Sequence, residues 1–126
     1  MDKNAFLIQL SESDRTDHGR VEFSAQSQPQ QVFSAIWALE SEVTNGGFGS
    51  FFENEDPALV AFAAEALKII GATKCSDIVR RAIPAGPEQR DDFDAEFYEY
   101  PDNLTELLFS FVSSNPAEFG AASIRG

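Results

Sequence analysis

Carboxylates are the side chains of this chain with the most evident chemistry, and they are concentrated in two stretches. Residues 88–106 hold eight acidic side chains and one basic one, Arg90. Residues 40–56 hold five acidic side chains and no basic one, whereas four of the nine basic residues fall within residues 68–81. Carboxylates gathered in this way can bind a basic surface or, as pairs, perform acid–base catalysis.

The spacing within the first stretch predicts a helix with one charged side. Asp92, Glu96 and Glu99 are four and three residues apart, which places them on one side of a helix. An aromatic series with the same spacing predicts the buried side: Phe93, Phe97 and Tyr100. A solvated helix face is the ordinary interpretation of such a charge run, and a binding surface for a basic partner is the alternative.

We identify the acidic residues of these stretches as candidate partner-binding residues. The main set is Asp91, Asp92, Asp94, Glu96, Glu99 and Asp102. A second row is formed by Glu53, Glu55 and Asp56. An enzymatic alternative would pair Glu40 with Glu53, but such a pair needs surroundings that separate the two pKa values, and the sequence does not show them. A ligand pocket could form beside Trp37, but aromatic residues at helical spacing are usually core.

Composition excludes several classes of function. The formal net charge of −12 disfavours direct binding to nucleic acid or to an anionic membrane. Cys75 and His18 are the single cysteine and the single histidine, so we expect no disulfide, no zinc site, no metal and no cofactor. We predict no catalytic residues, and we expect a cytoplasmic protein because the sequence shows no secretory signal and no apolar run of ~20 residues.

The elements that position the carboxylates are predicted to be helices of one compact domain spanning residues 1–126. We expect an all-α bundle of about five to six helices, with a core at residues 29–115. The clearest helix follows Pro29, where Val32, Ile36, Leu39 and Val43 are spaced by four, three and four residues. For residues 1–28 we favour a short helix followed by a loop, although Arg20-Val-Glu-Phe-Ser24 also alternates like a strand. Residues 116–126 are expected to form a frayed tail in which Phe119 docks.

A glycine motif is predicted to end that helix. Glycine and asparagine tolerate the left-handed conformation of a helix end, so the chain should stop at Asn45-Gly46-Gly47 and turn sharply. Phe48, Phe51 and Phe52 restart helical spacing at once, so we expect the turn to point their rings back at the preceding helix. The structural motif comprises Trp37, Asn45, Gly46, Gly47, Phe48, Phe51 and Phe52.

Local signals predict the boundaries of three further helices. Asp56-Pro57 opens a helix that ends at Gly71, and Thr73 is the expected cap of the next one. Residues 104–112 form the last amphipathic helix.

With these elements in place, the chain resembles the DNA mimic protein nineteen family over residues 30–115. The resemblance is carried by the Trp37 helix leading into Glu42-Val-Thr-Asn-Gly-Gly-Phe48, the Phe51-Phe52 pair, the helix ending in Ala66-Leu-Lys-Ile-Ile-Gly-Ala72, and Phe93-Asp-Ala-Glu-Phe-Tyr98. Thr44 departs from the asparagine usual in the family. The resemblance implies an all-helical domain and, for the member that named the family, an acidic surface that occupies the DNA site of DNA-binding proteins. It transfers no functional residue one by one, because the shared motif is structural.

We therefore expect an acidic protein-binding module rather than an enzyme. The expected partner is a basic protein, such as a transcription factor or a nucleoid protein. An acidic inhibitor or immunity-type protein acting on a basic enzyme is the alternative, and homodimer formation stays open.

Overall fold

A computed structural model describes residues 2–119 and consists of helices, with no strand among them. The helices are α1 (Lys3–Ser11), α2 (Gln28–Asn54), α3 (Pro57–Ile69), α4 (Thr73–Ala82), α5 (Pro87–Tyr98), α6 (Leu104–Ser113) and α7 (Pro116–Phe119), with a 3-10 turn, η1, at Phe23–Ala25. The predicted all-α fold is confirmed. The four-residue α7 was not predicted as a helix.

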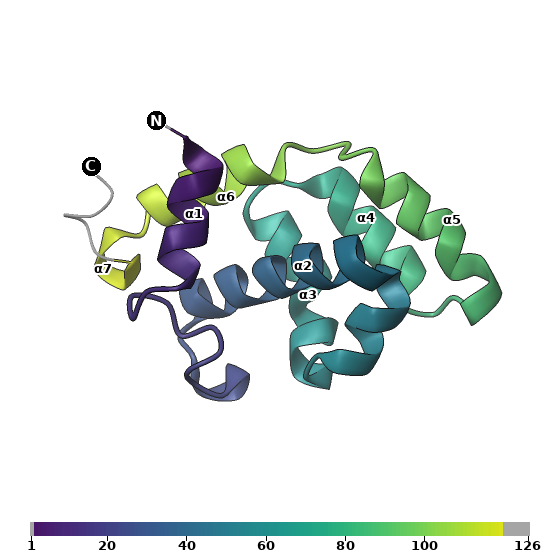
Figure 1. Cartoon of the computed structure of the whole chain (residues 1–126), viewed down its shortest axis with the longest axis horizontal. Helices are drawn as coiled ribbons and strands as arrows, with labels where there is room; N and C mark the ends of the chain where they lie inside the picture. The colour runs from purple at the N-terminus through teal and green to yellow at the C-terminus, as the bar shows by residue number, and fades with distance from the viewer. Residues whose placement is uncertain (1, 120–126) are drawn as a thin grey trace.

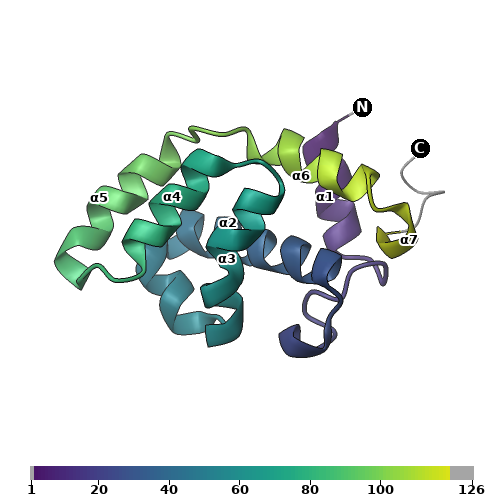
Figure 2. The ribbon, with the colours of Figure 1, turned by 180° about the vertical axis from the view of Figure 1, so that it is seen from behind.

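Helix α2 is the long central element of the fold. In Figure 1, α1, α6 and α7 lie towards one end of α2, and α4 and α5 lie towards the other. Figure 2 shows the same division from behind. The contacts agree: α2 packs against α3 and α5, α4 packs against α3 and α5, and α1 packs against α6. The acid-rich helix α5 is therefore held by two other helices.

Local capping signals explain why α3 begins and ends where it does. The Asp56 carboxylate accepts a hydrogen bond from the Ala58 amide, and Pro57 starts the helix. At the other end Gly71 adopts a φ of 91°, and the Ala72 amide donates to the Leu67 carbonyl at 2.8 Å. This is the Schellman closure of a helix, so both predicted boundaries are confirmed.

The predicted break of the central helix at the glycine motif is confirmed in its position, but the helix resumes directly after it. Residues on both sides of the break are helical, and Gly47 between them leaves the helical region, with φ 76° and ψ −176°. A single residue of this kind kinks a helix without ending it, because the next turn resumes at once. The motif therefore joins two halves of α2.

The structure also corrects two further local predictions. Thr73 is the first residue of α4 rather than its cap, and Ala72 stands at the cap position without a side-chain hydrogen bond. Tyr100 is exposed at 44% and lies beyond the end of α5, with φ 48°, so it does not extend the buried side. The helix ends before the third member of the aromatic series.

The N-terminal segment is tied to the far end of the chain by one buried amide side chain. Gln30 accepts a hydrogen bond from the Asp17 amide and donates to the carbonyls of Arg15 and Glu118. A buried amide with every group satisfied specifies one arrangement of the chains it joins. The predicted helix and loop of residues 1–28 are observed, and Phe119 is buried against Phe33, as predicted for its ring. The rest of the predicted frayed tail, residues 120–126, lies outside the described residues.

Candidate functional site: the acidic side of α5

Four carboxylates form an exposed surface on α5, which we call the α5 acidic face. Its members are Asp91, Asp92, Glu96 and Glu99, and all four are exposed. A helix turns by roughly 100° per residue, which places these residues on the side opposite the buried Phe97. Phe97 contacts Phe48 of α2 edge to face, with ring centroids 5.8 Å apart. One buried ring thus anchors the helix and turns the carboxylates outward.

The one basic residue of the acidic stretch points away from this face. Arg90 is half-buried, and its guanidinium lies 5.2 Å from the centroid of the Phe52 ring. Its Nε atom is buried and has no hydrogen-bond partner within residues 2–119. The cation is therefore held by an aromatic ring rather than by a carboxylate of the α5 acidic face.

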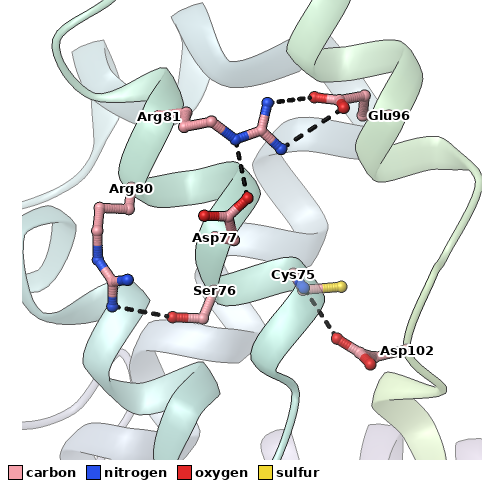
Figure 3. Close-up of polar contacts among 7 residues, drawn as sticks. All are labelled: Cys75, Ser76, Asp77, Arg80, Arg81, Glu96 and Asp102. Carbon is pink, nitrogen blue, oxygen red and sulfur yellow. Dashed lines mark hydrogen bonds and ion pairs between the residues drawn. The ribbon is translucent and has the colours of Figure 1, made fainter.

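The neighbouring basic residue of α4 is occupied by two carboxylates. Figure 3 shows Arg81 between Asp77 and Glu96, with N–O distances of 2.9 and 3.0 Å. Hydrogen bonds first to Glu96 and then to Asp77 raise the pKa of the Arg81 guanidinium, which stays charged. All three side chains are exposed, so the pairs contribute little to stability. Glu96 therefore stays exposed although it is paired with Arg81.

Asp94 has a different position from the rest of α5. It is half-buried, and its Oδ1 accepts a hydrogen bond of 2.8 Å from the Phe48 amide, directly after the break at Gly47. The Tyr98 hydroxyl donates to the Val43 carbonyl, before the break, at 2.5 Å. Two side chains of α5 thus satisfy backbone groups on either side of the kink in α2. This contact fixes the register of the acidic helix.

Asp102 is engaged in the interior as well. Its Oδ2 accepts a hydrogen bond of 2.8 Å from the Cys75 amide in the first turn of α4, as Figure 3 shows. A remote carboxylate therefore caps α4 in place of the predicted Thr73. Burial raises the pKa of the Cys75 thiol to about 11, so this cysteine is protonated at neutral pH and is a core residue, not a nucleophile.

Replacing Asp102 with alanine should destabilise the protein by about 1–2 kcal/mol, because α4 loses its cap and its favourable charge. Asp102→Asn keeps an acceptor oxygen and should cost less. Urea unfolding followed by circular dichroism measures both. Equal stabilities for the alanine variant and the parent would show that this cap contributes nothing.

The second set of predicted residues lies at the junction of α2 and α3. Glu53 is exposed, and Asp56 is the exposed cap of α3. Glu55 is half-buried, and its pKa is raised by burial and by the nearby Glu42. The three carboxylates therefore have three different environments. Of the three, Glu53 is the one that is exposed and makes no side-chain hydrogen bond or ion pair within residues 2–119.

The residues of the glycine motif lie in and around the core. Phe48 and Phe51 are fully buried, and Trp37 and Phe52 are half-buried. Trp37 stacks on Phe33 with ring centroids 5.5 Å apart. The contacts of Asp94 and Tyr98 with the backbone of α2 were not predicted from the sequence, because neither residue type signals such a contact.

The structure also bears on acid–base catalysis, metal binding and membrane crossing. Glu40 lines a hollow between α1, α2 and α6, whereas Glu53 is exposed beyond the Gly47 break, so the two do not form an acid–base pair. Within residues 2–119, no group of three or more His, Cys, Asp or Glu side chains is arranged to hold a metal ion. No helix in that range has the length and apolar character needed to cross a membrane.

Comparison with known proteins addresses the family. No curated protein and no solved structure matches the chain. The family model described as DMP19-like protein matches residues 24–115, which include α2 to α6 and confirm the extent of the resemblance. This family is not a known enzyme family. Because the match covers well over half of the chain, the protein belongs to the DMP19-like protein family, that of DNA mimic protein 19.

Proposed function

We propose that this protein is an acidic protein-binding module that uses the α5 acidic face to occupy the DNA site of a basic, DNA-binding protein. The observation that carries the proposal is the placement of the nearby cations. Arg90 turns inward onto Phe52, and Arg81 is paired with two carboxylates. The outward side of α5 is left with exposed carboxylates. Family membership supports the same class of function.

The density of charge on this face is close to that of one DNA strand. Asp91 to Glu99 spans eight residue steps, or about 12 Å of helix, so the four carboxylates lie ~4 Å apart on average along the helix axis, and one of them, Glu96, is paired with Arg81. One strand of B-form DNA carries one phosphate per about 3.4 Å of axis. The match concerns one strand only. A duplex-like field requires a second row, for which Glu53 is the best placed of the predicted residues.

The first test removes the charge of the face without disturbing the fold. Combining Asp91→Asn, Asp92→Asn and Glu99→Gln should weaken capture of the partner by about tenfold or more and reduce the effect of salt. Each of these side chains is exposed. Capture from a native lysate at low and moderate salt, compared with the parent, measures the change.

A matched variant controls for net charge. Glu12→Gln, Asp14→Asn and Glu65→Gln remove the same number of charges from exposed positions outside α5. This variant should capture the partner as the parent does. Equal capture by both triple variants would overturn the assignment of the face.

A competition experiment then separates the two functional classes. A captured protein should be released by duplex DNA if the face occupies its DNA site. Capture of a basic enzyme that DNA cannot displace would favour the inhibitor or immunity-type alternative.

A further inference from the structure

Two adjoining hollows lie on the side of the molecule where α1 and α6 meet α2. One has a volume of about 210 Å³ and lies beside Trp37. The other has a volume of about 470 Å³ and extends along the Tyr100–Thr105 segment. They share Asn4, Glu40 and Thr105, and we call them together the α1/α6 cleft. The volume of the larger hollow is within the range of small-molecule sites, roughly 300–1,000 Å³, and that of the smaller hollow is below this range.

The two parts of the cleft differ in chemistry. The smaller hollow is lined by apolar side chains, which include Leu7, Trp37 and Leu108, and by polar ones, which include Ser41, Thr44 and Thr105. The larger one contains the carboxylates of Glu40 and Asp102. The lining residues of both hollows include no lysine, arginine or histidine. The cleft is therefore a partly apolar recess next to two acidic side chains, of which Asp102 accepts a hydrogen bond from the Cys75 amide.

Glu40 is the central group of this cleft. It is half-buried, stands in both hollows, and its carboxylate has no hydrogen bond or ion pair to any group within residues 2–119. Burial raises the pKa of the Glu40 carboxyl. A desolvated carboxylate without a partner is costly, and a cation placed against it would offset that cost.

We propose that the α1/α6 cleft binds a primary amine with an apolar body. The ammonium group would lie between Glu40 and Asp102, and the body would fill the recess beside Trp37, Leu7 and Leu108. A free carboxylate on the ligand would be repelled, so amino acids should be rejected. The site is separate from the α5 acidic face and does not depend on the proposed function.

Trp37 is the single tryptophan of the chain and lies in the wall of the cleft, so its fluorescence reports directly on occupancy. Phenethylamine should produce a saturable change at neutral pH. 2-Phenylethanol has the same body without the charge, and phenylalanine adds a carboxylate. Both should bind at least about tenfold more weakly.

Two substitutions test the role of Glu40. Glu40→Gln should weaken phenethylamine binding by about tenfold or more. Thr44→Lys, at an exposed position one turn later, should block the cleft because the new ammonium can pair with Glu40. Circular dichroism verifies that each variant is folded. Glu12→Gln removes an exposed carboxylate outside the cleft and should leave binding unchanged.

A pH titration provides a further readout. Asp102, Tyr100 and Cys75 face Glu40 from the neighbouring segments. The pKa values of Tyr100 and Cys75 are both raised by burial, so these two groups are neutral at pH 7. Phenethylamine binding should weaken as the pH falls and Glu40 takes up a proton.

Several results would overturn the proposal. These are the absence of a saturable Trp37 signal with phenethylamine, equal binding of 2-phenylethanol, or binding that survives both Glu40→Gln and Thr44→Lys. The triple variant of the α5 acidic face should bind the amine normally. A loss of partner capture with intact amine binding, or the reverse, therefore distinguishes failure of one proposal from failure of the other.

Discussion

Gly47→Ala should lower the free energy of unfolding by about 3 kcal/mol or more, because it combines backbone strain with loss of a charged hydrogen bond. Gly47 has φ 76° and ψ −176°, a conformation that is essentially restricted to glycine. A Cβ atom there would lie 2.3 Å from Oδ2 of Asp94. The Asp94 carboxylate would have to move away from the Phe48 amide. Urea unfolding measured by circular dichroism gives the loss.

A neighbouring glycine supplies the control for this substitution. At Gly49 an added Cβ would meet only Arg90 Nη1 within 4 Å, at 3.7 Å, which is ordinary contact. Gly49→Ala should therefore be neutral or stabilise by up to ~1 kcal/mol, since alanine is the better helix former. Equal effects of the two substitutions would show that the kink at Gly47 carries no special requirement.

The second large effect is expected at Phe97. Phe97→Ala should cost about 3–5 kcal/mol, because the ring is fully buried and its removal leaves a cavity between α5 and α2. The substitution should also impair the proposed function, because Phe97 holds α5 against Phe48. Partner capture should decrease although every carboxylate of the α5 acidic face is still present.

Phe97→Leu is the matched variant, and it should cost only about 1 kcal/mol because most of the buried volume is kept. Unfolding free energies and partner capture are measured on the same preparations. If Phe97→Ala were nearly as stable as Phe97→Leu, the packing of α5 on α2 could not be the anchor of the face.

Much of the fold was predictable because its signals are local. The apolar spacing from Val32 to Val43, the Asp56-Pro57 start and the Gly71 end each depend on residues within a few turns of one another. Such signals describe where a helix can form. They do not distinguish a helix that stops at a glycine motif from one that bends and continues, as at Gly47.

The family resemblance also gains a physical explanation. The glycine motif and the Phe93–Tyr98 segment were two separate parts of that resemblance, more than forty residues apart. In the structure they form one contact, in which Asp94 and Tyr98 satisfy the backbone on the two sides of the kink. The shared motif therefore describes how α5 is held against α2. The charges on the outer side of α5 are a separate property.

By itself, the sequence determined an acidic helical domain, its family and the helix that carries most of the carboxylates, because composition and helical periodicity are properties of neighbouring residues. Only the tertiary structure decided which carboxylates face outward. Asp94, Asp102 and Glu96 find partners 46, 27 and 15 positions away, at Phe48, Cys75 and Arg81. No local spacing encodes such pairs, since they depend on how the helices pack. Asp91, Asp92 and Glu99 are left exposed without a partner among residues 2–119, and Glu96 is exposed but paired with Arg81.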